Sequence, residues 1–207
     1  MARPNRIPLF PLEVVLLPKM PLPLHIFEPR YKEMIRLCLD QKLEFGTVLA
    51  ANNAIATVGC TAEIVRKLQE YPDGRMDILV EGCAIFRMVE LYSDKPYHEA
   101  TVEYLEDATS LLDPEQRNRL ISAFDDCHMQ LFGRHWAPDD REEDEILAYR
   151  IGAILPLELG KKQALLEMRA EGERREFILQ WINAFLPKLF ERHRSRKRAG
   201  SNGHALN

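Results

Sequence analysis

The sequence lacks the features that mark a membrane or secreted protein. It contains no run of about 18 apolar residues, the length that a membrane-spanning helix needs. Its first residues run at once into prolines, without the unbroken apolar segment and the small-residue cleavage site of a signal peptide. We therefore expect a cytoplasmic protein that has no contact with a membrane.

Metal-binding motifs are absent as well. The four cysteines (Cys38, Cys60, Cys83 and Cys127) are far apart and form no CxxC pair, and none of the six histidines lies in an HExxH motif. Reduced cysteines of this kind behave as small core residues. The sequence therefore predicts no metal site and no cofactor.

Catalytic motifs are equally scarce. The segment 160–162 is nearest to a phosphate-binding loop, but Leu155 stands where the loop needs its first glycine, and no Ser or Thr follows the lysines. The serine of segment 200–203 is misplaced for a nucleophile elbow. We expect a protein that is not an enzyme.

Charge is distributed unevenly along the 207 residues. The net charge is −4, but the last 16 residues hold five basic side chains and no acid, which leaves −9 for residues 1–191. These five side chains suit nucleic-acid phosphates, although no aromatic residue is interleaved for base stacking. A solvated, disordered tail over 192–207 is the alternative. The five residues are Arg192, Arg194, Arg196, Lys197 and Arg198.

Proline dominates the beginning of the chain, where seven of the 13 prolines fall within 30 residues. Proline lacks the N–H that a strand ladder needs. The apolar segments 6–10 and 13–18 therefore predict irregular edge strands at the mouth of a barrel. Pro29 is typical of a first helical turn, and an apolar stripe from Tyr31 to Leu39 predicts a helix of about three turns.

Strand patterns follow this helix. The segments 44–51, 58–71, 75–92 and 97–107 read as strands, and Asp73-Gly74 predicts a hairpin with a type I′ turn. Gly59 and Gly82 inside the strands predict bulges or close backbone approach. Short strands with one early helix indicate a small, partly closed barrel.

The second half has helical periodicity instead. Asp113 and Pro114 predict the start of a helix that ends at Gly133, and Asp140 with Glu143 predicts another that Pro156 stops. Segments 161–168 and 173–190 predict two more, with Pro187 kinking or ending the last. The predicted fold class is α+β. A barrel spans 1–108, a helical bundle 109–191 and a disordered tail 192–207.

Four segments carry a recognisable family pattern: "IPLFPLEVVLLPKMPLPLHIFEPRY", "VGCTAEIV", "PDGRMDILVEGCAIFRM" and "LPLELGKKQALLEM". Together they resemble the Lon N-terminal domain, also called the Lon substrate-binding domain. The resemblance covers roughly residues 7–185. It implies a PUA-like barrel followed by a helical bundle, which agrees with the strand-then-helix pattern.

The resemblance also implies a function. Nothing here resembles the ATPase module or the protease serine segment of Lon, so we expect a stand-alone recognition domain without enzymatic activity or cofactor. Its implied partner is exposed, unfolded or degradation-prone polypeptide. An adaptor to a separate protease or chaperone is one form of this role, although the sequence names no such partner.

The segment around the first helix holds the candidate binding residues, which are Pro23, His25, Phe27, Glu28, Arg30 and Tyr31. In the functional interpretation they line a groove in which an extended peptide adds to the proline-rich edge. In the structural interpretation Glu28 caps the helix, while Arg30 and Tyr31 attach it to the barrel.

Two further functions remain open at this point. PUA-type barrels are often RNA readers, so a nucleic-acid-binding module that uses the basic tail is the main alternative, and the net charge of −9 outside the tail argues against it. A small-ligand pocket in the barrel mouth is the third hypothesis. The acidic run 139–145 fits either a solvated loop with a helix start or a surface for a basic partner.

Overall fold

The computed structural model describes residues 3–51, 53–108, 113–136 and 144–201, with side chains described as far as Glu191. The chain divides into two compact units. One unit comprises Met1–Ala108 and Gly152–Arg169, and the other comprises Thr109–Ile151 and Ala170–Asn207. The segment 152–169 thus groups with the strands, whereas the division expected from the sequence assigned it to the helical bundle.

The first unit contains six strands and two complete helices. Its elements in chain order are β1 (Arg6–Leu12), β2 (Pro21–Ile26), α1 (Pro29–Gln41), β3 (Phe45–Ala51), β4 (Ala54–Glu70), β5 (Met76–Tyr92), β6 (His98–Tyr104) and α4 (Leu159–Glu167).

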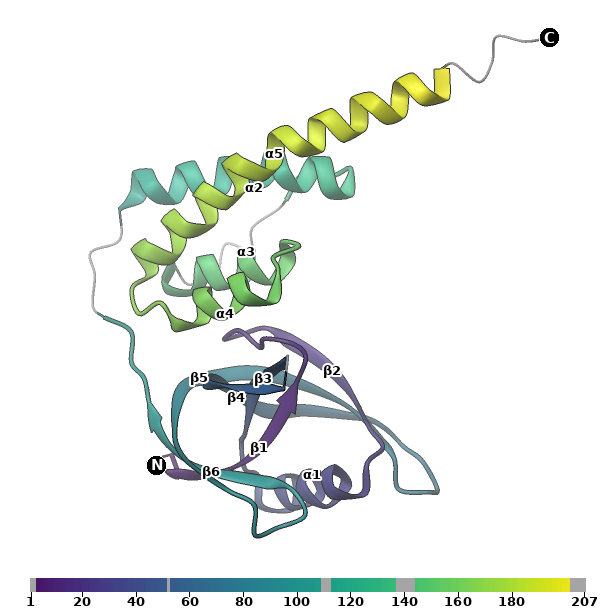
Figure 1. Cartoon of the computed structure of the whole chain (residues 1–207), viewed down its shortest axis with the longest axis vertical. Coiled ribbons are helices and arrows are strands. Elements are labelled where there is room, and N and C mark those ends of the chain that lie inside the picture. The colour runs from purple at the N-terminus through teal and green to yellow at the C-terminus, as the bar shows by residue number, and fades with distance from the viewer. Residues whose placement is uncertain (1–2, 52, 109–112, 137–143, 202–207) are drawn as a thin grey trace, which may run out of the picture. The chain divides into compact units, whose positions relative to one another are not determined.

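Strand pairing closes most of this unit into a barrel (Figure 1). The sheet order is β2-β5-β4-β3-β1-β6, and β6 also pairs with β5. Strands β5, β4, β3, β1 and β6 therefore form a ring, and β2 joins β5 outside it. The predicted barrel with one early helix is confirmed.

Strand β1 has a partner strand on each side, β3 and β6, so the prediction that segment 6–10 forms an edge strand is wrong. It pairs with β6 through Arg6–Leu9 and with β3, in parallel, through Leu9–Leu12. Pro8 and Pro11 lie in the halves that have only one partner strand each. The backbone nitrogen of each proline, which has no N–H, can therefore face the side without a partner, so that no ladder hydrogen bond is lost.

Segment 13–18, the second expected edge strand, is not a strand. Its apolar residues Val15, Leu16 and Leu17 are buried in irregular backbone. A proline at each end of the segment 11–18 restricts the backbone at those positions, while burial of the three side chains still contributes hydrophobic stabilisation.

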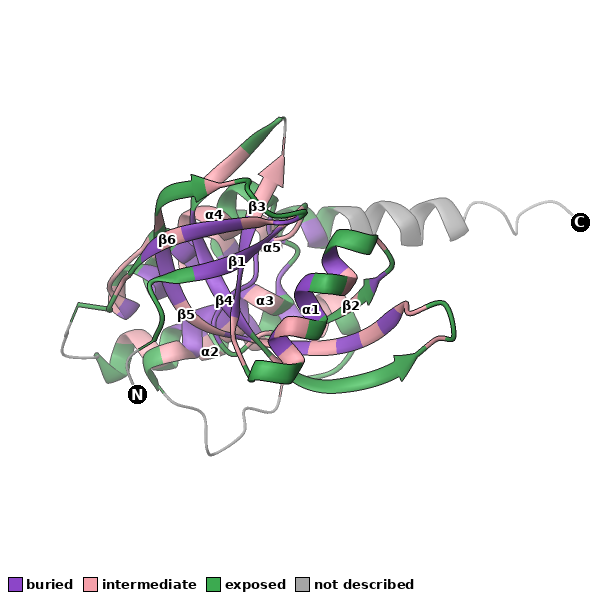
Figure 2. Ribbon diagram, turned by 90° about the horizontal axis from the view of Figure 1, so that it is seen from below, coloured by how far each residue is buried: buried purple, intermediate pink, exposed green. Residues whose placement is uncertain are grey.

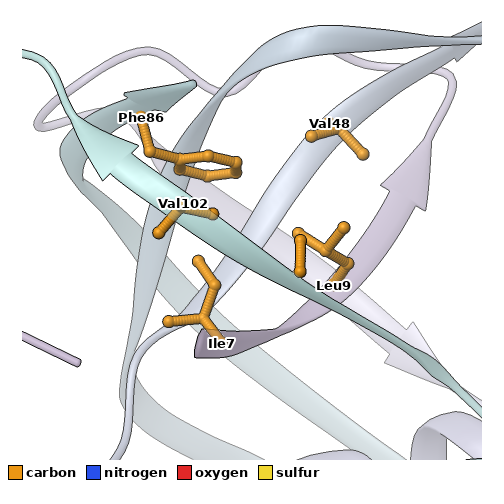
Figure 3. Packing of buried hydrophobic residues seen from close by; sticks show 6 residues of the cluster. Ile7, Leu9, Val48, Phe86 and Val102 are labelled. Carbon is orange, nitrogen blue, oxygen red and sulfur yellow. The ribbon is translucent and has the colours of Figure 1, made fainter. Parts of the chain in front are cut away.

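The core of the barrel is a cluster of side chains from four strands, β1, β3, β5 and β6. Its residues Ile7, Leu9, Val48, Phe86 and Val102 are shown in Figure 3. Phe86 projects between them, and two glycines leave room for its ring. A Cβ on Gly46 or Gly59 would lie 2.7 Å from the Phe86 ring. The prediction that Gly59 marks a close approach is confirmed.

The hairpin between β4 and β5 turns at Asp73-Gly74 as predicted, but the turn is not type I′. Only Gly74 has a positive φ, of 79°, and its N–H donates to the carbonyl of Tyr71 at 2.8 Å. A type I turn followed by a left-handed glycine explains both observations, because a type I′ turn needs a positive φ at both central residues.

The second unit is helical. It contains α2 (Pro114–Phe132), the short 3-10 turn η1 (Asp144–Ile146) and α5 (Glu171–Ser201), while α3 (Leu147–Ile154) crosses the boundary between the units. The α2 limits confirm the prediction, because Asp113 accepts from the N–H of Glu115 and Gly133 closes the helix at φ 71°. The helix start predicted at Asp140 lies outside the described residues.

Two arginines and one glutamate form a buried ionic cluster in this unit. Arg174 and Arg175 are fully buried, and both donate to Glu171, at 2.9 and 3.1 Å. Tyr149 accepts from Arg174, and the Glu171 carboxylate also accepts from the N–H of Ala148. Burial raises the pKa of Glu171, although these donors oppose that effect.

The end of the chain differs from the disordered tail that the sequence predicts. Helix α5 passes through Pro187 and continues to Ser201, so the backbone of residues 192–201 is helical rather than disordered. Residues 202–207 lie outside the described part. Pro187 therefore does not end the helix, and a kink at this position stays a prediction.

Candidate functional site

Part of the sheet extends beyond the barrel ring. Strand β3 pairs with β4 only as far as Ala62, so the rest of β4, Glu63–Glu70, has β5 alone as its partner. Strand β2 pairs with the other side of β5 from Met76 to Glu81. We call these three segments of β2, β5 and β4 the projecting sheet. Figure 2 shows the β4 segment exposed beside an alternately buried β5.

The two faces of the projecting sheet differ in burial. Met76, Ile78 and Val80 of β5 are buried, whereas Asp77 and Leu79 between them are partly exposed. Directly paired residues share a face. Pro23 pairs with Leu79 and His25 with Asp77, so these four residues occupy the more exposed side, which we call the outer face.

The edge of β2 that faces away from β5 is poor in hydrogen-bond donors. In an antiparallel ladder, every second residue of β2 donates its N–H to β5. Pro21 and Pro23 have no N–H, so they and His25 belong to the other set, whose backbone groups point away from β5. The ladder donors must therefore be Leu22, Leu24 and Ile26. Among Pro21, Pro23 and His25, only His25 presents an N–H to the open edge. This edge is consequently unfavourable for an added strand.

Two bulges shape the neighbouring part of β4. The register with β5 shifts between Ile64 and Arg66 and again between Lys67 and Gln69, so Val65 and Leu68 have no direct partner. Their side chains are 57% and 47% exposed. Bulges redirect side chains and twist an edge, and here they present two apolar residues to solvent.

The projecting sheet contains a hollow of about 340 Å³, lined by residues of all three strands. The lining residues are Pro23, Leu24 and His25 of β2, Leu68 and Gln69 of β4, and Asp77 and Ile78 of β5. Phe27 adds a further apolar side chain next to it. It is 59% exposed, and its ring stacks with that of His25 at 5.9 Å.

Asp77 is the acidic residue of the hollow. His25 Nδ1 lies 2.6 Å from Asp77 Oδ1, and the Tyr71 hydroxyl donates to Oδ2 at 2.8 Å. These hydrogen bonds, that of His25 first, lower the pKa of Asp77. The hollow thus combines apolar walls with one fixed negative charge.

The residues that begin α1 contact one another. Arg30 Nε donates to Glu28 Oε2 at 2.8 Å, and the Arg30 guanidinium lies 4.6 Å from the centre of the Tyr31 ring. Glu28 is the N-cap residue, but its side chain makes no capping hydrogen bond. Tyr31 is only 6% exposed and packs on Phe10, with ring centres 4.1 Å apart. Burial raises the pKa of Tyr31.

The structure therefore divides the six predicted binding residues. Pro23 and His25 line the hollow and Phe27 is exposed next to it, whereas Glu28 and Arg30 form a pair and Tyr31 is buried. The β4 residue Leu68 was missed from the sequence. Its signal is the pattern Ile64-Val65…Leu68, which breaks the two-residue period of a regular strand and indicates bulges.

Other predicted sites are less informative. The side chains of the basic residues 192–198 lie outside the described part of the chain. Within the described residues, no group of three or more His, Cys, Asp or Glu is arranged to hold a metal ion. No helix in that part is long and apolar enough to cross a membrane.

These features define a β-barrel domain with an exposed apolar surface on a projecting sheet. The chain belongs to the family of the ATP-dependent protease La (LON) substrate-binding domain, whose model matches residues 6–184. This membership supports a role in substrate recognition, and the matched region is a substrate-binding rather than a protease domain.

Known relatives agree with this assignment. The chain is 29% identical over 211 residues to the Lon protease of Escherichia coli K12, covering 93% of this chain and 26% of that protein. It is 24% identical over 203 residues to the Lon protease of Cytophaga hutchinsonii, covering 90% of this chain and 25% of that protein. The chain thus spans about a quarter of the length of these relatives.

Solved structures show the same fold. The crystal structure of the Lon N-terminal domain protein from Xanthomonas campestris matches with a TM-score of 0.69 and 26% identity, covering 85% of this chain and 98% of that one. The N-terminal domain of Mycobacterium avium complex Lon protease matches with a TM-score of 0.64 at 15% identity, covering 86% of this chain and 98% of that one. The second likeness concerns the fold alone.

Proposed function

We propose that this chain binds exposed apolar segments of unfolded polypeptide on the outer face of its projecting sheet. The observation that carries the proposal is the exposure of Leu68, which lines the hollow, together with that of Phe27, which stacks on the lining residue His25. Apolar side chains that are exposed together, with a hollow between strands, favour association with an apolar ligand. Family membership supports the same role.

Binding proceeds through side chains rather than through an added strand. The open edge of β2 lacks donors at Pro21 and Pro23. The free edge of β4 carries two bulges and the charged residues Arg66 and Lys67, which oppose strand addition. The peptide that we propose therefore lies across the outer face and inserts apolar side chains beside Leu68. This mode replaces the strand addition expected from the sequence.

Fluorescence anisotropy tests this function. The probe is a labelled polypeptide that has been reduced and carboxymethylated so that it cannot refold. Burying one large apolar side chain contributes about 1.5–3 kcal/mol, so Phe27→Ser with Leu68→Ser should weaken binding about tenfold or more. Unfolding in urea should show that this double variant remains as stable as the unchanged chain, because the two side chains are exposed.

A matched control separates this surface from general stickiness. Val89 of β5 is 65% exposed and lies outside the hollow. Val89→Ser should bind the probe as the unchanged chain does, and so should a variant with the five basic residues of 192–198 changed to Gln. Saturable and strongly salt-dependent binding of a labelled RNA by the unchanged chain, lost in the Gln variant, would instead favour the nucleic-acid hypothesis. No saturable binding by the unchanged chain would overturn the proposed function.

Delivery of the bound polypeptide to a separate protease or chaperone is the cellular role that we infer. Its support is the similarity to about a quarter of the length of Lon proteases. A purified Lon protease should degrade the carboxymethylated probe faster when the chain is present. Phe27→Ser with Leu68→Ser should lose this acceleration. Equal rates with and without the chain would contradict the adaptor role but leave polypeptide binding intact.

A further inference from the structure

The hollow has an apolar part and an acidic part, which lie on neighbouring strands. Leu68 and Pro23 provide apolar walls from β4 and β2, and Asp77 lies on β5 between them. Neighbouring strands are about 4.8 Å apart. In an extended peptide, side chains on the same face are about 7 Å apart. When one of them contacts Leu68, the next one on that face can therefore reach the Asp77 carboxylate.

The Asp77 carboxylate retains capacity for a ligand. An ionised carboxylate has about four acceptor positions, and His25 and Tyr71 use one on each oxygen. His25 forms an ion pair with Asp77 only when its ring is protonated, and within the described residues no lysine or arginine forms one with Asp77, although the Arg75 charge also lowers the pKa of Asp77. The cation in the adjacent turn, Arg75, binds Asp73 at 2.7 Å and lies 5.0 Å from the centre of the Tyr71 ring.

His25 and Tyr71 also fix the orientation of the carboxylate. The Tyr71 hydroxyl donates to one oxygen, and the His25 ring, which stacks with Phe27, contacts the other. A carboxylate held at both oxygens loses little further freedom when a ligand binds. Asp77 therefore provides a preorganised negative charge in a mainly apolar surface.

We propose that Asp77 is a specificity-determining residue that makes the hollow prefer peptides with a lysine or arginine two positions from a large apolar residue. Charge complementarity selects this occupant: the apolar residue contacts Leu68, and the cation contacts the free acceptor positions of Asp77. The inference rests on the proposed function, because it specifies which segments of an unfolded polypeptide bind most tightly.

The test uses labelled peptides that differ in one side chain. Each peptide presents alternating leucines, and one position two residues from a leucine holds Lys, acetyl-lysine or Glu. Acetylation removes the charge but keeps the side-chain stem. Partly exposed ion pairs contribute up to about 1 kcal/mol, so the full chain should bind the Lys peptide about three- to fivefold more tightly than the acetyl-lysine peptide.

Two variants locate the effect. Asp77→Asn should bind both peptides with the affinity that the unchanged chain shows for the acetyl-lysine peptide. Glu63→Gln removes an exposed carboxylate of the projecting sheet outside the hollow and should keep the preference. If Asp77→Asn proves unstable in urea unfolding, Tyr71→Phe with His25→Gln keeps the carboxylate, and the preference should persist in weaker form.

The outcomes distinguish this inference from the proposed function. Equal binding of the Lys and acetyl-lysine peptides by the unchanged chain would overturn the role of Asp77 while the apolar surface stands. Tighter binding of the Glu peptide would also overturn it and would point to Arg66, which lies opposite Leu79. Failure of every peptide and of the unfolded probe would overturn both proposals.

Discussion

Pro23 of β2 lies directly opposite Leu79 of β5, within an antiparallel ladder in which only alternate β2 residues can donate to β5. The proline therefore blocks the open edge of β2 without weakening its pairing to β5. This arrangement explains why a proline-rich segment occurs in a strand at all. It also predicts that a peptide binds here through its side chains, without main-chain hydrogen bonds to the edge of β2.

N-methylation of alternate peptide bonds tests that mode. An added strand would lose its ladder hydrogen bonds when its N–H groups are methylated, whereas side-chain contacts would remain. We expect a leucine-rich peptide and its N-methylated form to bind with affinities within about threefold, since no main-chain hydrogen bond of about 1 kcal/mol is lost. A drop of a hundredfold in anisotropy titrations would show that the peptide pairs with a strand edge.

Gly82 provides a second prediction, because it anchors the segment that enters β2. Its carbonyl accepts from the N–H of Lys19 at 2.8 Å, and its N–H donates to Met20. A Cβ there would lie 2.2 Å from the carbonyl oxygen of Leu17. Gly82→Ala should therefore lower the free energy of unfolding by about 3 kcal/mol and weaken polypeptide binding.

The control for this substitution is Gly160 in α4, where an added Cβ would meet nothing within 4 Å. Gly160→Ala should leave the stability unchanged or raise it by up to about 1 kcal/mol, because alanine restricts the unfolded chain and favours a helix. Urea unfolding of both variants checks the pair. A Gly82→Ala variant as stable as Gly160→Ala would show that the segment before β2 can move aside.

The sequence predicted the elements whose signals are local. Pro29 and the apolar stripe located α1, Asp113 and Gly133 located α2, and the Asp73-Gly74 pair located the hairpin. Each signal acts within a few residues, through a missing N–H, a capping side chain or a left-handed backbone.

Features that depend on long-range pairing were missed. The interior position of β1 depends on how β3 and β6 divide its length, and its prolines alone favoured an edge. Burial of Arg174 and Arg175 depends on Glu171 and Tyr149 meeting them, although arginine is seldom fully buried. The hollow depends on bulges that bring Leu68 toward β2.

The buried cluster of the helical unit gives a third prediction. Glu171→Gln would leave Arg174 and Arg175 buried without the carboxylate that both contact. Breaking a buried ion pair by removing one partner costs about 3–5 kcal/mol, so we expect a loss of about 3 kcal/mol in unfolding free energy. Glu173→Gln, an exposed change in the same helical turn, should alter it by less than about 0.5 kcal/mol. Equal effects would mean that the arginines are solvated.

Asp77 predicts a dependence of stability on pH. Hydrogen bonds from His25 and Tyr71 hold its pKa below the ordinary value of 3.8. Because the pKa is lowered in the folded state, the stabilisation is present above pH 3.8 and is lost as the pH falls through the folded-state pKa. The difference in urea midpoint between the unchanged chain and Asp77→Asn should therefore shrink below pH 3.8. A difference that grows on acidification would contradict the shift.

Tyr31 and Phe27 make the sharpest pair of predictions, because the two aromatic residues are four positions apart and have opposite environments. Tyr31 is buried against Phe10, whereas Phe27 is exposed beside His25. Tyr31→Ala should lower the unfolding free energy by about 3–5 kcal/mol, as other buried aromatic truncations do. Phe27→Ala should leave it within about 0.5 kcal/mol of the unchanged value.

Binding should respond in the opposite way. Within the described part of the chain, the Tyr31 hydroxyl makes no hydrogen bond, so Tyr31→Phe should change neither the stability nor the affinity for the carboxymethylated probe. Phe27→Ala should weaken that affinity severalfold, because it removes apolar area from the proposed surface. If Tyr31→Phe instead lost binding at unchanged stability, the Tyr31 hydroxyl would have to reach the ligand. The start of α1 would then belong to the recognition surface, and the Glu28–Arg30 pair would have to open during binding.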